Sequence, residues 1–361
     1  MNKEEINKYL ITPESSLKVV MRALNSASGK VLFVVDGSEK LVGSVTDGDI
    51  RRAILNGIGF ERPVADVMFK FPRSIKKSDR NLEATAKKLV LEQRIYVIPV
   101  IDDSSHIVDV LFWRDLFEFH PHEPISVEKV ENPVVIMAGG KGERLDPFTK
   151  ILPKPLIPLG DKPIIERIMD SFNKFGFQNF ILTLNYKKEL IKMYLKENQF
   201  PYNVSWVEEE DFLGTAGSLR LLKENVKDTF FVSNCDVILE SDFRNILLWH
   251  KGENALATLI GCHKEMLVPY GTLEVDGGRL KAINEKPAFD MIINTGLYIF
   301  DPKVLDLIGD GEKLDMNHLL ERVMKKGKVS VYPVCDGWFD IGQWKEYNDS
   351  LYLLQNGKSG S

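Results

Sequence analysis

A glycine-rich stretch near the middle of the chain is followed closely by two cationic side chains. The apolar residues 134–137 lead directly into Ala138-Gly139-Gly140-Lys141-Gly142-Glu143-Arg144-Leu145, and Pro153-Lys154-Pro155 follows. Such an apolar run ending in glycines predicts a buried parallel strand and the loop at its carboxyl end. Glycines let the loop amides approach a ligand closely and face phosphate oxygens. With Arg144 and Lys154 at the same edge, the pattern predicts a nucleoside triphosphate site.

Two well-known phosphate loops do not fit this stretch. A Walker loop ends in Gly-Lys-Ser or Gly-Lys-Thr, and no such triplet follows these glycines. The dinucleotide fingerprint requires a third glycine after Gly140-Lys141-Gly142, where Arg144-Leu145 stands instead. A lone Gly-x-Gly fits a tight turn after a strand equally well, so the prediction depends on the longer string that continues to Lys154.

The longer string resembles the signature of sugar-1-phosphate nucleotidyltransferases. Their usual pattern is Ala-Gly-Gly-x-Gly-x-Arg-Leu, then Pro-x-Thr, here Pro147-Phe148-Thr149, and then Pro-Lys-Pro. The resemblance covers roughly residues 132–350 and implies an α/β domain with a Rossmann-like, mostly parallel sheet. It implies that Arg144 and Lys154 take up charge on the departing pyrophosphate. It also implies nucleotide binding by four loop residues, Ala138, Gly139, Gly140 and Gly142.

A second loop, Leu213-Gly214-Thr215-Ala216, follows an acidic run. In the family this sequence lies beside the nucleotide base, which implies that Gly214 and Thr215 contact it. The acidic run resembles that of guanylyltransferases for mannose-1-phosphate-like substrates. One carboxylate can accept hydrogen bonds from both N1–H and N2–H₂ of guanine, and uracil and cytosine offer no such pair.

Within the acidic run, Glu209 or Glu210 would select GTP. The family usually has proline before Leu-Gly, and Phe212 replaces it here, so the register of the acidic residues stays open. A solvated charged loop is the alternative interpretation of such a run.

Two aspartates far apart in the chain resemble the magnesium ligands of the family. Asp236 ends an apolar run, with Cys235 in place of the usual glycine, and Asp340 lies within residues 337–342. Mg²⁺ is typically held by one or two carboxylates together with substrate phosphates, so this pair would suffice. Either aspartate alone would also fit a turn or a helix cap. The resemblance gives Asp236 a catalytic role through the metal at the α-phosphate.

Three short motifs between these aspartates resemble the sugar pocket of the family. In Tyr270-Gly271 the glycine backbone would contact a sugar hydroxyl. In Glu285-Lys286-Pro287 the glutamate would bind sugar hydroxyls and the lysine would hold the attacking phosphate. Asn294 and Thr295 are further candidates for hydroxyl contacts. Each motif alone fits ordinary loop chemistry, and it is their order along the chain that favours the sugar pocket.

The first 120 residues contain an internal repeat. Residues 31–36 match 97–102, and Asp49-Ile50 matches Asp115-Leu116; each matching pair is 66 residues apart. Each copy has a helical stretch, a β-branched run that ends at aspartate, a second strand, and an aspartate that opens a helix. The pattern predicts two copies of one small α/β unit.

This repeat resembles a tandem pair of CBS (cystathionine-β-synthase-type) repeats, known as a Bateman module, which commonly binds adenine nucleotides. The family's contacts come from Thr-x-x-Asp, which Thr46 and Asp49 preserve. In the second copy Phe112 replaces the threonine before Asp115. The resemblance implies that Thr46 reaches a phosphate and that the aspartates accept from ribose hydroxyls. The alternative is that both aspartates only cap helices.

The motifs together imply that an NTP and a sugar 1-phosphate give an NDP-sugar and pyrophosphate, with Mg²⁺ as cofactor. The attacking phosphate is already an anion, so catalysis needs positioning and charge neutralisation rather than a general base. A guanylyltransferase fused to CBS repeats resembles bacterial enzymes that activate amino sugars, which favours GTP and glucosamine 1-phosphate. Other NTPs and mannose, glucose or heptose 1-phosphate stay open. A nucleotide-sensing protein with an inactive transferase half is the alternative.

The expected organisation follows from these motifs and from the linker-like composition after the repeats. We expect a tandem CBS pair at 1–120, with repeats at about 10–62 and 63–120, a linker at 121–131, a nucleotidyltransferase domain at 132–350 and a tail at 351–361.

Composition excludes several other classes of protein. With 27% charged residues, a net charge of −5 and no long basic run, nucleic acid is not an expected partner. No apolar run is long enough to span a bilayer, and the first residues lack the order of a signal peptide. Three cysteines without Cys-x-x-Cys spacing favour reduced thiols in the cytoplasm. We expect a homo-oligomer, although the sequence does not fix the number of subunits.

Overall fold

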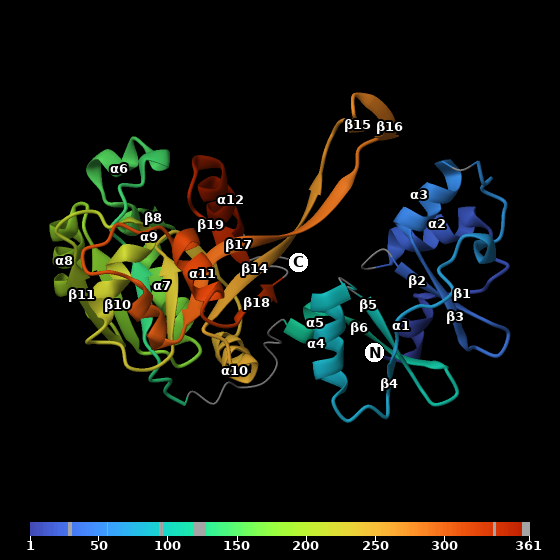
Figure 1. Ribbon diagram of the computed structural model, residues 1–361, viewed down its shortest axis with the longest axis horizontal. Helices are drawn as coiled ribbons and strands as arrows, with labels where there is room; N and C mark the ends of the chain where they lie inside the picture. The colour runs from blue at the N-terminus through green and yellow to red at the C-terminus, as the bar shows by residue number, and fades with distance from the viewer. Residues whose placement is uncertain are drawn as a thin grey trace. The chain divides into compact units, whose positions relative to one another are not determined.

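The computed structural model describes residues 1–27, 31–55, 57–93, 95, 97–117, 128–334 and 337–355. The chain divides into two compact units, Met1–Phe117 and Glu118–Ser361 (Figure 1). Most of the expected linker, Cys335, and the end of the expected tail lie outside the described residues. Across the described ranges, no helix is both long and apolar enough to cross a membrane.

The N-terminal unit contains the same three-stranded sheet twice. The first copy comprises β1 (Leu10–Ile11), β2 (Val31–Val35) and β3 (Leu41–Thr46), and the second comprises β4 (Ile75–Lys76), β5 (Val97–Ile101) and β6 (Ile107–Phe112). In both copies the first strand is parallel to the second, and the second is antiparallel to the third. Val31 pairs with Thr46, and 66 residues later Val97 pairs with Phe112. The predicted internal repeat is therefore confirmed.

Helices cover these sheets, and the two copies share one core. The helices are α1 (Lys3–Asn7), α2 (Leu17–Ser26), α3 (Asp47–Leu55), the 3₁₀ turn η2 (Val64–Asp66), α4 (Leu82–Gln93) and α5 (Trp113–Phe117). The core of the first copy continues into Val97, Val110 and Phe112 of the second. The Phe112 ring packs edge-on against Tyr9, with ring centroids 5.4 Å apart. Phe112 therefore fills core space at the position where the first copy has a threonine hydroxyl.

The C-terminal unit is organised around a seven-stranded sheet in the order β11-β10-β7-β12-β17-β14-β18. These strands are β7 (Val134–Met137), β10 (Asn179–Leu184), β11 (Asn203–Glu208), β12 (Phe230–Asn234), β14 (Ala257–Leu267), β17 (Ala288–Phe300) and β18 (Val329–Val334). The first four strands in that order are mutually parallel, β17 is antiparallel to both of its neighbours, and β14 is parallel to β18. The mostly parallel α/β fold is confirmed.

Helices lie on both faces of this sheet. Phe231 on β12 contacts Phe172 of α7 (Ile164–Asn173) and Phe243 of α10 (Phe243–Glu253), with ring centroids 5.3 and 6.0 Å away. Its neighbours Phe230 and Val232 belong to a second cluster. Because successive strand residues face opposite sides, this cluster lies on the other face. It contains residues of α9 (Gly214–Gly217), η5 (Ser218–Leu222), η6 (Pro302–Leu307) and α11 (Met316–Met324).

Further described elements complete the C-terminal unit. They are η3 (Glu143–Leu145), α6 (Phe148–Ile151), η4 (Lys154–Leu156), β8 (Pro158–Leu159), β9 (Lys162–Pro163), α8 (Lys188–Glu197), β13 (Val237–Leu239), β19 (Trp338–Asp340) and α12 (Trp344–Gln355). Residues 351–355, which we expected in the tail, continue α12. The helix thus runs past 350, where we expected the tail to begin.

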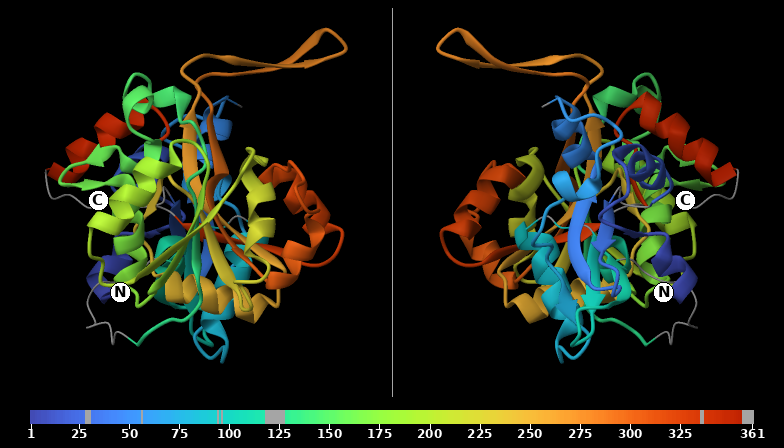
Figure 2. Two further views of the ribbon diagram at one scale, coloured as in Figure 1. Left: turned by 90° about the vertical axis from the view of Figure 1, so that its left-hand side faces the viewer. Right: turned by 90° about the vertical axis from the view of Figure 1, so that its right-hand side faces the viewer.

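A two-stranded ribbon extends from the sheet, and we call its residues 263–292 the arm (Figure 2). It begins as the outer ends of β14 and β17 and finishes in the hairpin of β15 (Thr272–Asp276) and β16 (Arg279–Asn284). β18 pairs with β14 only as far as Cys262. Beyond that point the arm stands clear of the seven-stranded sheet.

Candidate active site

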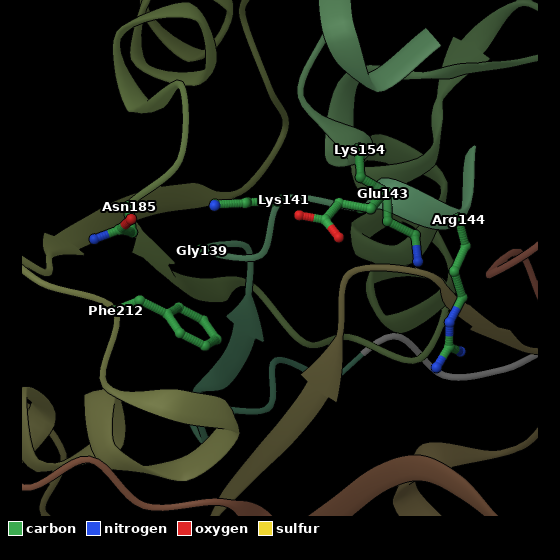
Figure 3. Close-up of a pocket in the computed structure, with 8 residues that line it drawn as sticks. Gly139, Lys141, Glu143, Arg144, Lys154, Asn185 and Phe212 are labelled. Atoms are coloured by element: carbon green, nitrogen blue, oxygen red, sulfur yellow. The ribbon is translucent and has the colours of Figure 1, made fainter. Parts of the chain in front are cut away.

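A cavity of about 560 Å³ opens at the carboxyl end of β7, a volume typical of small-molecule sites. Asn185 and Phe212 lie at one end, Arg144 and Lys154 lie at the other, and Lys141 projects between them (Figure 3). The cationic end could hold phosphates, and the end with the aromatic ring could hold a base. The lining residues are Gly139, Lys141, Gly142, Glu143, Arg144, Lys154, Asn185 and Phe212.

Glycine is required at two positions of the loop that follows β7. Gly142 has φ +69°, and a Cβ there would lie 2.9 Å from the Cβ of Lys154. At Gly139, a Cβ would lie 2.8 Å from Glu209 Oε1 and 3.3 Å from the Cβ of Asn185. Any side chain would push these neighbours apart, so glycine brings the loop against both ends of the cavity. Ala138 is fully buried, and its N–H donates to the Thr183 carbonyl at 3.0 Å.

The two cations of the signature lie in different environments. Arg144 is exposed at the cavity mouth, whereas Lys154 is half-buried and its ammonium contacts the Asp236 carboxylate. Burial lowers the pKa of Lys154, but the negative charge of Asp236 outweighs this and leaves the pKa raised. Lys154 is therefore a permanent cation that now neutralises Asp236 and could turn to a phosphate instead.

Asp236 and Asp340 lie side by side, although more than a hundred residues separate them in sequence. β13 and β19 pair antiparallel with Val237 opposite Asp340. A Cβ at Gly342 would lie 2.8 Å from Asp340 Oδ1 and 3.5 Å from Asp236 Oδ2, so both carboxylates converge on this glycine. Burial and the charge of Asp236 raise the pKa of Asp340.

This carboxylate pair fits a hard divalent ion. Searching the described residues finds no cluster of three or more His, Cys, Asp or Glu side chains that could hold a metal by itself. A cation between Asp236 and Asp340 would therefore take its remaining ligands from substrate phosphates or water, which is the usual arrangement for Mg²⁺.

The two glutamates proposed for base selection differ in position. Glu209 is 3% exposed, its Oε1 faces Gly139 in the cavity wall, and its Oε2 accepts from the Leu213 N–H at 3.0 Å. Burial raises the pKa of Glu209. Glu210 is exposed. Only Glu209 has an oxygen directed at a residue that lines the cavity.

Gly214 and Thr215 have contacts of their own in the structure, and their contact with the nucleotide base stays a prediction. A Cβ at Gly214 would lie 2.6 Å from the Leu314 carbonyl, and Thr215 Oγ1 accepts from the Met316 N–H at 2.8 Å. Both residues thus pack on the start of α11, where Thr215 satisfies an amide of the first helical turn. Neither belongs to the described residues that line the cavity.

The sugar-binding candidates are split between the arm and its base. Gly271, Glu285 and Lys286 are exposed on the arm, and the described lining of the cavity includes none of them. Asn294 donates to the Tyr298 hydroxyl at 2.9 Å, and the buried Thr295 hydroxyl donates to the Ile260 carbonyl at 2.7 Å. Sugar binding by these residues therefore stays a prediction, because Gly271, Glu285 and Lys286 lie on the arm and outside the described lining of the cavity.

The structure adds contacts that we did not assign from the sequence. Asn185 directly follows β10 at the same sheet edge as the glycine loop, so the rule that ligands bind at strand ends could have found it. The Lys187 ammonium donates to the Thr149, Lys150 and Ile151 carbonyls at 3.2, 2.6 and 3.0 Å, which satisfies the end of α6. The sequence pattern does not predict this contact of Lys187 with the end of α6.

A cluster on α12 holds the segment that follows the glycine loop. Trp344 Nε1 donates to the Asp146 carbonyl at 2.9 Å, and the Trp344 ring packs on Phe148 with centroids 4.8 Å apart. The Tyr347 hydroxyl donates to the Pro158 carbonyl at 2.8 Å. The last helix thus fixes the backbone on both sides of Lys154.

In the N-terminal unit, Thr46 and Asp49 bond to each other. The Thr46 N–H donates to Asp49 Oδ2 at 2.9 Å, and the Asp49 N–H donates to Thr46 Oγ1 at 3.3 Å. This reciprocal pair is a capping box at the start of α3. Asp115 lies in the first turn of α5. Helix capping is enough to explain the contact between Thr46 and Asp49. Nucleotide binding by Thr46, Asp49 and Asp115 stays a prediction.

The family follows from comparison with known proteins. The model of the nucleotidyl transferase family matches residues 133–356, which is most of the C-terminal unit, and the chain belongs to this family. A model of the CBS domain matches residues 3–56, in the first copy of the repeat. Both resemblances stated from the sequence are confirmed at this level.

The names of the similar proteins refer to different nucleotides and sugars. A mannose-1-phosphate guanyltransferase of Yarrowia lipolytica is 34% identical over 230 residues, 61% of this chain and 63% of that protein. The chain thus spans less than two thirds of that relative. A probable glucose-1-phosphate cytidylyltransferase of Bacillus subtilis is 32% identical over 58% of this chain and 91% of that protein. HddC from Yersinia pseudotuberculosis, complexed with GMP-PN, superimposes with a TM-score of 0.51 and 25% identity, covering 62% of this chain and 99% of HddC.

Proposed function

We propose that this chain is a sugar-1-phosphate nucleotidyltransferase that uses GTP, Mg²⁺ and, as the first sugar substrate to test, glucosamine 1-phosphate. The observation that carries the proposal is the cavity at the end of β7, with Arg144 and Lys154 at one end and the Asp236–Asp340 pair next to Lys154. Its cationic end suits a triphosphate, and its volume suits one nucleotide. The relatives that act on sugar 1-phosphates support the reaction class.

The reaction would depend on charge rather than on proton transfer. The sugar phosphate attacks the α-phosphorus, the bond to the β-phosphate oxygen breaks, and pyrophosphate leaves with the negative charge. Arg144, Lys154 and the loop amides would stabilise that charge in a half-buried site, where fixed donors act strongly. Asp236 and Asp340 would hold Mg²⁺, which when bound neutralises charge on the α-phosphate.

Guanine selection would come from Glu209. Its carboxylate faces Gly139 at the cavity wall, and an ionised carboxylate can accept from N1–H and N2–H₂ of guanine together. Phe212, 46% exposed and in the cavity lining, would offer an aromatic surface to the base. The Yarrowia relative and the HddC complex support a guanine nucleotide, whereas the Bacillus relative names a cytidylyl group.

A substrate panel tests this proposal directly. Purified chain is incubated with Mg²⁺ and each of GTP, CTP, UTP and dTTP, against glucosamine, mannose, glucose and heptose 1-phosphates, and pyrophosphate and product mass are measured. We expect a product with the mass of a GDP-sugar, formed from GTP. A product from UTP or dTTP in preference to GTP contradicts the role of Glu209, and no product from any pair contradicts the enzyme class.

The cellular setting of the proposal is the cytoplasm. Cys235 is buried, and burial raises the pKa of its thiol to about 12, which disfavours the reactive thiolate form. A buried thiol of this kind is consistent with a reducing compartment. An adenine nucleotide at the CBS pair and a homo-oligomeric state stay predictions.

A further inference from the structure

The arm is an unbroken extension of the sheet for its first five residue pairs. β14 and β17 stay in register from Gly261 opposite Asn294 to Leu267 opposite Ala288. In the part of the chain that the structure describes, their register shifts only between Leu259 and Gly261, inside the sheet. The five pairs outside the sheet span about 17 Å. Lys286 lies beyond them, so about 17 Å or more of ribbon separates it from the point where the arm leaves the sheet.

The tip of the arm has one apolar face and one polar face. Leu273 lies opposite Ile283 and Val275 lies opposite Leu280, and each is between 55% and 63% exposed. Met266 lies opposite Phe289 nearer the base, and both are about half exposed. The alternate positions of β15 and β16 pair polar or small residues, such as Thr272 with Asn284. Such alternation is typical of a ribbon that packs one face against another surface.

An isolated two-stranded ribbon is marginally stable in water, and an exposed cluster of apolar side chains such as that at the tip marks a contact surface. The arm also presents Gly271, Glu285 and Lys286, which suit a sugar phosphate but lie outside the described cavity lining. A surface that both covers the apolar face and uses these groups must contain a second nucleotide cavity. A second copy of this chain provides one.

We propose that two copies exchange arms, so that the arm of each chain covers the cavity of the other and completes its sugar end. Lys286 of the partner subunit would then hold the attacking phosphate beside Asp236 and Asp340. In a dimer with two-fold symmetry both arms are covered in the same way, because each subunit contributes one arm and one cavity to the interface. This inference rests on the proposed function for its chemistry, but the pairing itself can be measured without activity.

The test is a mixed dimer of two inactive chains. Asp236→Asn and Lys286→Ala chains with different affinity tags are co-expressed, and dimers that carry both tags are isolated. With exchanged arms, each mixed dimer holds one intact core covered by one intact arm, so about half of the wild-type rate should return. If each arm serves its own chain, neither chain has a complete site and almost no activity returns, which overturns the proposal.

The reciprocal pair excludes an artefact of co-expression. A wild-type chain is combined with a chain that carries both Asp236→Asn and Lys286→Ala. Exchanged arms leave this mixed dimer nearly inactive, because the intact core receives the altered arm. Arms that fold back on their own chain would instead leave about half of the wild-type rate.

Mass in solution tests the pairing independently of catalysis. The wild-type chain should have twice the monomer mass of 41.1 kDa, and Leu273→Ser combined with Ile283→Ser should reduce it to the monomer. Glu274→Ser, on the polar face of the same strand, is the matched control and should stay dimeric. A monomeric wild-type chain at micromolar concentration overturns the proposal. If the wild-type chain is inactive with every substrate pair, the proposed function fails and the mass comparison alone decides the pairing.

Discussion

The two ends of the candidate site are built in opposite ways. The nucleotide end is formed by strands buried in the centre of a seven-stranded sheet, where Val134, Val135 and Ile136 are fully buried. The sugar end lies on an exposed ribbon that only two strands support. Close packing fixes the first end before any ligand arrives. If arms are exchanged as we propose, the second end needs a partner surface, so the two ends should respond differently to mutation.

The largest effect is expected at the junction of the two ends. Asp236→Asn should lower turnover by roughly 10²–10³-fold, because it removes one carboxylate from the charge system around the α-phosphate. Steady-state pyrophosphate release measures this. Asp211→Asn, in the exposed acidic run, is the control and should retain activity. Near-normal turnover of Asp236→Asn would defeat the metal assignment.

Lys286→Ala, a substitution on the arm, should affect the sugar end without affecting nucleotide binding. It should lower turnover to a similar degree while GTP binding, measured by calorimetry without sugar, stays at the wild-type affinity. A parallel loss of GTP affinity would show that the arm belongs to the nucleotide end and would remove the distinction drawn above.

Glu209→Gln should have an intermediate effect, and the quantity that changes should be the preference for GTP over other nucleotides. An amide offers one acceptor where the carboxylate offers two, so the preference for GTP over UTP should fall about 10–100-fold, the worth of a hydrogen bond to a charged group. Glu210→Gln should leave the preference intact. The pKa of Glu209 is raised by burial, so the wild-type preference should also fall as the pH drops through that raised pKa. Equal losses with every NTP would give Glu209 a purely structural role.

The smallest effect concerns the stability of the sheet where α10 meets β14 and β18. His250 is 3% exposed and bonds to Thr258 at 2.8 Å, which in turn bonds to Ser330 at 2.6 Å. Burial lowers the pKa of His250 below its ordinary value of 6.5. The unfolded chain therefore binds the proton more readily, and stability should fall as pH drops below 6.5.

Thermal melts of wild type and His250→Asn between pH 5 and 8 would measure this slope. The variant should melt lower at neutral pH but lose less stability on acidification. Identical slopes in the two proteins would assign the pH dependence to other groups.

Local motifs explain why the nucleotide end was largely predictable. The glycine loop, Arg144 and Lys154 fall within a short segment, and the strand before them is apolar throughout. Asp236 and Asp340 were each identifiable as acids at strand ends, although only the pairing of β13 with β19 shows that they meet. Asn185 also follows directly after a strand, β10, but we did not assign it to the site from the sequence because no recognisable motif surrounds it.

The arm was not predictable, because alternation shows that a strand has an apolar face but not what covers it. The sequence of β15 and β16 fits a hairpin folded on its own domain as well as one that projects. The contacts that Gly214 and Thr215 make in the structure were not predictable for a related reason. Their motif fixes a turn, whereas Leu314 and Met316, a hundred residues away, determine which way the turn faces.

The contact between α12 and the segment after the glycine loop has a consequence for biosynthesis. Trp344 and Asp146 are 198 residues apart, so a ribosome completes the loop long before it makes the helix that fastens it. At ordinary translation speeds of roughly 5–20 residues per second, that interval lasts on the order of ten seconds or more. A nascent chain would therefore lack the contact that fastens the segment after the glycine loop until α12 emerges, so the candidate site should be complete only when the C-terminal unit is nearly complete.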